Sequence, residues 1–84
     1  MEERVVPDDI AACMILKKSL TILRDIYVRL PFCYRLAKRA SFEAERAEAL
    51  FCQKIGELYP ETRRSKTLKY DIRNKLLRWD VEDE

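Results

Sequence analysis

The clearest pattern in the chain is a run of apolar residues at helical spacing between two prolines, Pro7 and Pro31. Proline fits the first turn of a helix, and the residue before a proline is pushed out of the α region. Asp8 and Asp9 place negative charge where the helix dipole favours it. Together these signals predict a helix from about Asp8 to about Arg29.

Half of this predicted helix is apolar. At about 100° per residue, one side of the helical wheel collects Ile15, Leu16, Leu20, Ile22, Leu23, Ile26, Tyr27 and Leu30. The other side collects Lys17, Lys18, Thr21, Arg24 and Asp25. An apolar arc of about 180° is wider than a surface helix needs. We therefore expect this helix either to be the central helix of the fold or to meet a second chain.

A second helix is predicted almost directly after the first, from near Phe32 to about Leu58. Its apolar stripe begins with alanines spaced three and four apart, at positions 37, 40, 44 and 47, and continues through Phe51, Ile55 and Leu58. Small side chains let two helix backbones approach closely. We therefore expect this stripe to pack against the first helix. Gly56 followed by Pro60 is a stop signal.

Two details of this region stay open. The chain either kinks or reverses direction at Leu30–Pro31. Ser41 is a suitable N-cap for a new helix that would begin at Phe42, so a break in the second helix near Lys38–Ser41 is a further alternative.

A third helix is predicted from about Glu61 or Ser65 to Trp79. Four apolar residues of this segment share one helical face, namely Leu68, Ile72, Leu76 and Trp79. The predicted fold class is all-α, a small irregular bundle of three helices in one domain over residues 1–84. The acidic segments 1–7 and 80–84 are expected to be flexible.

The charges are unevenly distributed although the net charge is only +2. Residues 61–79 are basic, and acidic residues crowd the two ends of the chain. Basic residues with an aromatic neighbour occur twice. The candidate partner-binding residues are Arg35, Arg39, Phe42 and Arg46 in the second helix, and Lys66, Lys69, Tyr70 and Arg73 in the third. Arginine beside Tyr or Phe is typical of interface hot spots, but a solvated charged face would show the same composition.

Catalysis and metal binding find little support in the composition. The chain has no histidine, and therefore no easy general base near neutral pH and no imidazole metal ligand. One glycine, Gly56, cannot form a glycine-rich phosphate loop. Cys13, Cys33 and Cys52 contain no C-x-x-C pair. We expect no enzyme activity, no cofactor and no metal.

The predicted function is a protein–protein interaction module, such as an adaptor, assembly factor or inhibitor, that meets an acidic surface. The alternative is a small nucleic-acid-binding protein that uses the basic helix 61–79. The apolar arc of the first helix also suggests a homodimer. The start of the chain does not resemble a signal peptide, and its uncharged runs are far shorter than a membrane span, so we expect a cytoplasmic protein without a membrane partner.

Overall fold

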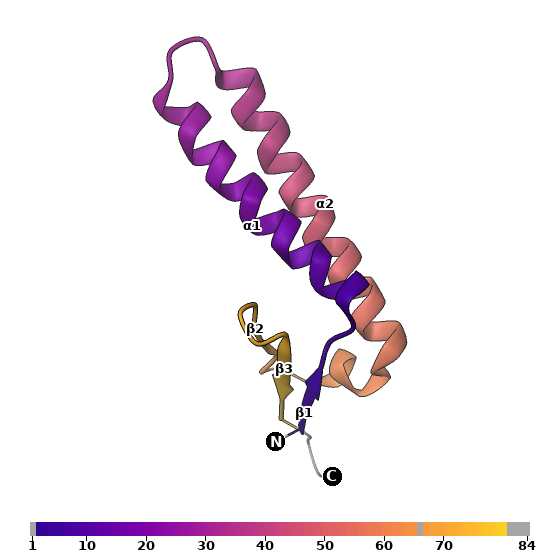
Figure 1. The fold of residues 1–84 in the computed structure, drawn as a ribbon. Helices are drawn as coiled ribbons and strands as arrows, with labels where there is room; N and C mark the ends of the chain where they lie inside the picture. The colour runs from indigo at the N-terminus through magenta and orange to yellow at the C-terminus, as the bar shows by residue number, and fades with distance from the viewer. Residues whose placement is uncertain (1, 66, 81–84) are drawn as a thin grey trace.

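A long α-helical hairpin stands on a small antiparallel sheet in this computed structural model, which describes residues 2–65 and 67–80 (Figure 1). The elements, in chain order, are strand β1 Glu2–Val5, helix α1 Asp8–Arg29, helix α2 Tyr34–Leu58, the 3-10 helix η1 Pro60–Arg64, strand β2 Lys69–Asp71 and strand β3 Leu76–Trp79. The molecule is elongated, with principal extents of 53 × 23 × 18 Å. The fold is therefore mostly helical, with two helices and a sheet in place of the three predicted helices.

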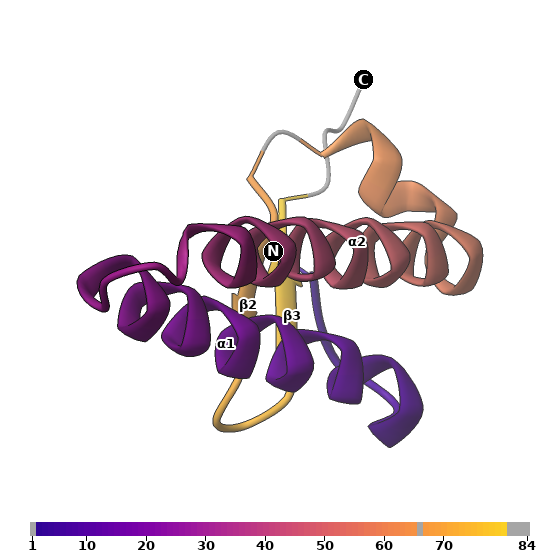
Figure 2. The same ribbon diagram turned by 90° about the horizontal axis from the view of Figure 1, so that it is seen from above.

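Helix α1 has the bounds that the prolines predict. The carbonyl oxygen of Pro7 accepts a hydrogen bond from the backbone N–H of Ala11 at 2.9 Å, which closes the first turn. At the other end the chain reverses rather than kinks. Pro31 and Phe32 form a turn, and Phe32 takes a left-handed backbone conformation with φ of 62°. Helix α2 then runs back along α1, and the two lie side by side in both views (Figures 1 and 2).

Helix α2 is one continuous helix, so the break considered near Lys38–Ser41 does not form. No Gly or Pro interrupts the sequence between Tyr34 and Ile55, and a single serine costs little inside a helix. The alanines at 37, 40, 44 and 47 are buried, each 5–6% exposed. Their close packing against α1 is confirmed.

The predicted third helix is wrong. Leu77 and Trp79 are buried while Arg78 between them is exposed, which is the two-residue period of a strand. The turn before it has its own chemistry. One carboxylate oxygen of Asp71 accepts hydrogen bonds from the backbone N–H groups of Arg73 and Asn74, at 3.0 and 3.3 Å. An aspartate that binds the backbone two residues on favours a turn over a helix.

The sheet joins the two ends of the chain in the order β1-β3-β2, with both pairs antiparallel. Residues Glu2 to Val5, within the segment 1–7 that we expected to be flexible, form the edge strand β1, with Glu2 opposite Trp79. Next to it, the backbone N–H of Val6 donates a hydrogen bond to the carbonyl oxygen of Lys75 at 2.8 Å. Of the acidic tail 80–84, residues 81–84 lie outside the described residues.

The hydrophobic core lies at the base of the hairpin, where the sheet meets the first turns of α1 and the last turns of α2. Its buried members are Val6, Ile10, Ala11, Phe51, Ile55, Leu77 and Trp79. Aromatic rings extend it, because Tyr70 packs on Phe51 with ring centroids 4.9 Å apart and Tyr59 packs on Trp79 at 5.5 Å. Core packing at this end positions the rest of the hairpin, which projects away from it (Figure 1).

Candidate interaction surface

Helix α1 carries two seams of residues at heptad spacing, and their centres lie about 110° apart around the helix. The first seam is buried or half-buried and consists of Ile10, Cys13, Lys17, Leu20, Arg24 and Tyr27. This inner seam faces α2: the ammonium group of Lys17 forms an ion pair with the Glu48 carboxylate of α2 at 3.1 Å. The alkyl stems of Lys17 and Arg24 can lie over the slim alanine stripe while their charged ends reach solvent. The second, exposed seam is the outer seam and consists of Ala12, Leu16, Ser19, Leu23, Ile26 and Leu30.

Most of the apolar arc of α1 points away from α2. Its large residues are each 40–53% exposed, and we call them the outer face: Ile15, Leu16, Ile22, Leu23, Ile26 and Leu30. The prediction that this arc makes α1 the central helix is therefore wrong. The physical reason is the missing third helix, which would have supplied the cover.

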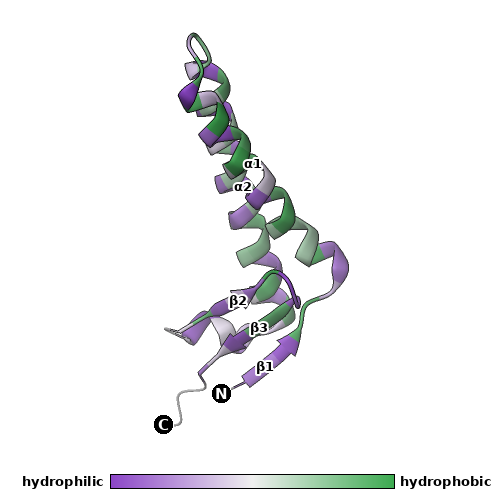
Figure 3. Ribbon diagram, turned by 60° about the vertical axis from the view of Figure 1, so that its left-hand side comes forward, coloured by the Kyte–Doolittle hydropathy of each residue, from purple (hydrophilic) through white to green (hydrophobic). Residues whose placement is uncertain are grey.

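The outer face is a continuous row rather than a scatter of single residues. From Ile15 to Leu30 it extends over about 22 Å of helix at 1.5 Å per residue. Apolar residues recur along the whole projecting part of the hairpin in Figure 3. Single exposed apolar side chains are normal on soluble proteins, whereas contiguous apolar patches mark interaction sites.

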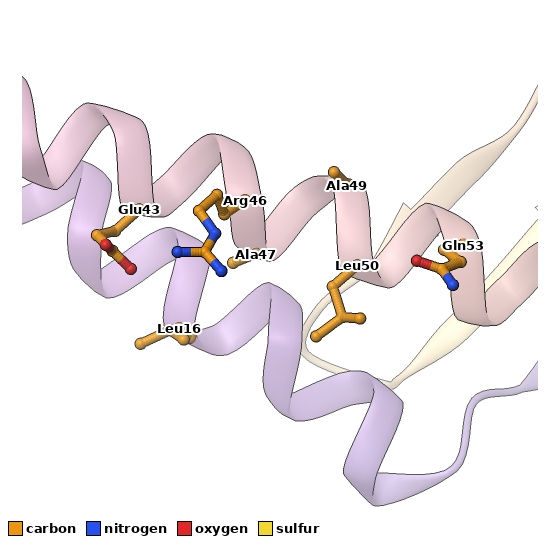
Figure 4. A pocket seen from close by; sticks show the side chains of 7 residues that line it. All are labelled: Leu16, Glu43, Arg46, Ala47, Ala49, Leu50 and Gln53. Carbon is orange, nitrogen blue, oxygen red and sulfur yellow. The ribbon is translucent and has the colours of Figure 1, made fainter.

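A shallow groove of about 440 Å³ extends this surface onto α2 (Figure 4). Its apolar lining includes Leu16 of α1 with Ala47 and Leu50 of α2, and Leu50 is 44% exposed. Glu43 and Arg46, which also line the groove, add opposite charges, and Figure 4 shows Arg46 extending from α2 toward α1. The groove is open and mostly apolar, which suits a side chain of a docked helix better than a small polar ligand.

A second depression lies on the other flank of the outer face. Ile15, Ser19 and Ile22 of α1 line it together with Ile72 and Arg73 of the β2–β3 turn. This arrangement brings one cationic side chain of the sheet beside the apolar row of the hairpin.

The eight residues predicted to bind a partner do not form a single surface. Arg35, Arg39, Phe42 and Arg46 are exposed outside the alanine stripe of α2, and Phe42 is 58% exposed. Lys69 on β2 and Arg73 in the turn are exposed near the base. Tyr70 packs against the core, and Lys66 lies outside the described residues.

The titratable groups with shifted pKa values lie at the base and have structural causes. A hydrogen bond from Lys75, with a distance of 2.6 Å, lowers the pKa of Asp8 and in turn raises the pKa of Lys75. Hydrogen bonds from Asn74 lower the pKa of Asp71, and burial raises the pKa of Tyr70. These shifts accompany the turn and the helix start rather than a reactive cleft.

Within residues 2–65 and 67–80, no group of three or more Cys, Asp or Glu side chains could hold a metal ion. The three cysteines, which all belong to the described part of the chain, are free thiols. Among the described residues, neither helix is long and apolar enough to cross a membrane.

Two exposed residues, Leu50 and Phe32, were missed as surface candidates. Leu50 does not belong to the alanine stripe, and an apolar residue off the buried stripe of an amphipathic helix is a usable signal. Phe32 follows Pro31 in the reversal, at a position where turns usually need glycine. Its exposure depends on the reversal, which the sequence left open.

Comparison with protein-family models, curated proteins and solved structures finds no match to this chain.

Proposed function

We propose that the protein is a non-enzymatic protein-interaction module whose projecting hairpin binds a partner through the outer face of α1. The observation that carries this proposal is the row of half-exposed Ile and Leu side chains from Ile15 to Leu30. Full burial of such a side chain is worth roughly 1.5–3 kcal/mol relative to full exposure. A partner that covers this row would gain a substantial share of that free energy at each position.

The basic side of α2 has a secondary role in this proposal. Arg35, Arg39 and Arg46 form one exposed stripe of α2, and Arg46 lines the groove beside Leu16 of the outer face, where this stripe can orient an acidic partner. Rim charges of this kind change the association rate and its salt dependence more than the affinity. Roles as an adaptor, assembly factor or inhibitor are all compatible with such a module.

Nucleic-acid binding has no specific observation in its favour. The proposal of a basic recognition helix over 61–79 depended on a helix that does not form. Lys69 and Arg73 instead belong to a short β-hairpin that also contains Asp71, and Tyr70 is packed on Phe51 rather than free to stack on a base.

The experiment is an affinity capture with tagged full-length chain, in which Leu23→Lys is compared with Arg39→Glu. Both residues are exposed, so both variants should keep the far-UV circular dichroism and unfolding midpoint of the wild type. We expect Leu23→Lys to lose the captured protein, and Arg39→Glu to retain most of it with weaker salt dependence, because the variant has less charge attraction for salt to screen. Nuclease treatment should change neither result.

Two outcomes would reject the proposal. Capture that is unchanged by Leu23→Lys would show that the outer face is not the binding surface. Capture that disappears on nuclease treatment would transfer the function to nucleic acid.

A further inference from the structure

We infer that the occupant of the outer face is a second copy of this chain, with the two α1 helices packed antiparallel and centred on Thr21. This inference rests on the proposed function, because it names the partner of the same surface. It depends on three observations: the surface area of the chain, the symmetry of its apolar spacing, and the charges beside that spacing.

The chain exposes more surface than a compact protein of its size. Its accessible surface is 6653 Å² for a mass of 10.0 kDa, whereas a compact monomer of that mass exposes about 5,200 Å². The radius of gyration is 15.2 Å, against about 12 Å for a compact domain of this length. The excess of about 1,400 Å² is larger than the roughly 800 Å² that each partner buries in a stable interface. One copy of a similar helix can therefore be accommodated.

The intervals between the residues of the outer seam read the same in both directions from Thr21. The seam runs through Ala12, Leu16, Ser19, Leu23, Ile26 and Leu30, with intervals of four, three, four, three and four. Reversal of the helix therefore places each seam residue level with another seam residue. An antiparallel pair of identical helices on a two-fold axis requires this property, because the same patch must complement itself in the reversed direction.

The pairs that this reversal creates match small residues with large ones. Ala12 lies level with Leu30 of the second copy, and Ser19 lies level with Leu23 of the second copy. Both small residues are exposed, so each leaves room for the facing leucine. A parallel pair in the same register would instead face Ala12 with Ala12 and leave gaps, which cost packing energy.

Charge also favours the antiparallel arrangement. Lys18 and Asp25 lie on the same flank of the outer face and are both exposed. In the antiparallel pair, Lys18 lies almost level with Asp25 of the second copy and on the same side of the interface, whereas a parallel pair places the two residues on opposite sides of it. The helix dipoles also favour the antiparallel pair, because the positive end of each helix lies beside the negative end of the other. The tip of each hairpin, with its fully exposed Phe32, then lies near the base of the other copy.

Disulfide trapping tests this arrangement in the full chain. Cys13, Cys33 and Cys52 are first replaced by serine, and circular dichroism establishes that this background folds. Ala12→Cys and Leu30→Cys are then made as two separate single variants. Within one chain these positions are about 27 Å apart, far beyond the roughly 7 Å that a disulfide can span between Cα atoms. Each variant has a single cysteine, so any cross-link joins two chains, and a parallel pair in the same register would hold positions 12 and 30 too far apart to link.

We expect a mixture of the two single variants to form the mixed disulfide dimer under mild oxidation, and each variant alone to remain largely unlinked. Self-linking of Ala12→Cys alone, at a rate equal to that of the mixture, would indicate a parallel pair and overturn the inference. Absence of cross-linking together with a monomeric mass would overturn it as well. If Leu23→Lys still lost a captured protein in that case, the proposed function would survive with a different partner.

Discussion

The base and the projecting half of the hairpin use apolar residues in opposite ways. At the base, Val6, Ile55, Leu77 and Trp79 are at most 1% exposed. In the projecting half, beyond the sheet, the buried residues of α2 are alanines, while the larger Ile and Leu side chains of α1 face outward. The base therefore holds the fold together, and the projecting half holds binding energy that the chain alone leaves unused.

The largest expected effect compares one substitution in the two regions. Leu77→Ala removes a fully buried side chain and should destabilise the protein by about 2–5 kcal/mol. Leu23→Ala, at a position that is 40% exposed, should cost less than about 1 kcal/mol. Urea denaturation at the lowest workable protein concentration, where a bound copy adds little stability, measures both values. Equal losses would contradict the division between the two regions.

The next effect tests the close approach of the helices in the projecting half. Ala44→Leu inserts three carbons where the backbones meet and should destabilise the protein by about 1–3 kcal/mol. Ala49→Leu is the matched control, because Ala49 is exposed on the same helix and the change should stay within about 0.5 kcal/mol. The thermal midpoints of the two variants give the comparison, and a loss in the control as large as in Ala44→Leu would contradict close packing.

A smaller gain is expected at the tip. Phe32 has φ of 62° and is fully exposed, so the described part of the chain shows no packing that offsets its backbone strain. Phe32→Gly should stabilise the isolated chain by about 0.5–1 kcal/mol, the relief of strain exceeding the entropy cost of glycine. Phe32→Ala keeps the strain and should show no such gain in the same denaturation series. Equal behaviour of the two variants would show that the left-handed turn is not strained.

The smallest effect concerns the exposed pair of Asp8 and Lys75, which ties the helix start to the β2–β3 turn. Because its pKa lies below 3.8 in the folded chain, Asp8 stabilises the fold above pH 3.8, and this contribution disappears as the pH falls through the lowered value. The pKa of Lys75 is raised in the folded chain. Protonated Lys75 therefore stabilises the fold fully below pH 10.5, and this stabilisation is lost as the pH rises through the raised value.

Lys75→Gln should therefore reduce stability slightly between these limits and match the wild type more closely in strong acid. Denaturation curves at several pH values measure the difference. Lys69→Gln lies on the same β-hairpin and forms no ion pair among the described residues, so it should leave the pH dependence unchanged. A stability difference for Lys75→Gln that persisted in strong acid would contradict the role of the pair.

The sequence predicted the helical hairpin well because its signals are local. Pro7, Pro31 and the alanine stripe act within a few residues, and both helices follow from them. The sheet was missed because β3 depends on pairing with β1, more than seventy residues away in the chain. Its period-two pattern covers only Leu76–Trp79, too short to outweigh the helical spacing of Leu68, Ile72 and Leu76.

The sequence identified the apolar residues of the candidate surface, but it did not predict that they are exposed to solvent. The wheel of α1 identified the apolar residues, yet whether they are covered depends on what residues 65–79 become. Asp71 and Asn74 gave a turn signal that could have corrected this, since both residues favour turns.

Sedimentation equilibrium of the full chain tests the central claim most directly, because it measures whether the projecting half is covered by another copy. The account predicts a mass of twice 10.0 kDa for the wild type at high concentration, and 10.0 kDa for Leu23→Lys with unchanged circular dichroism. A wild-type mass of 10.0 kDa at every concentration would contradict self-association, and an unchanged dimer mass for Leu23→Lys would place the interface elsewhere.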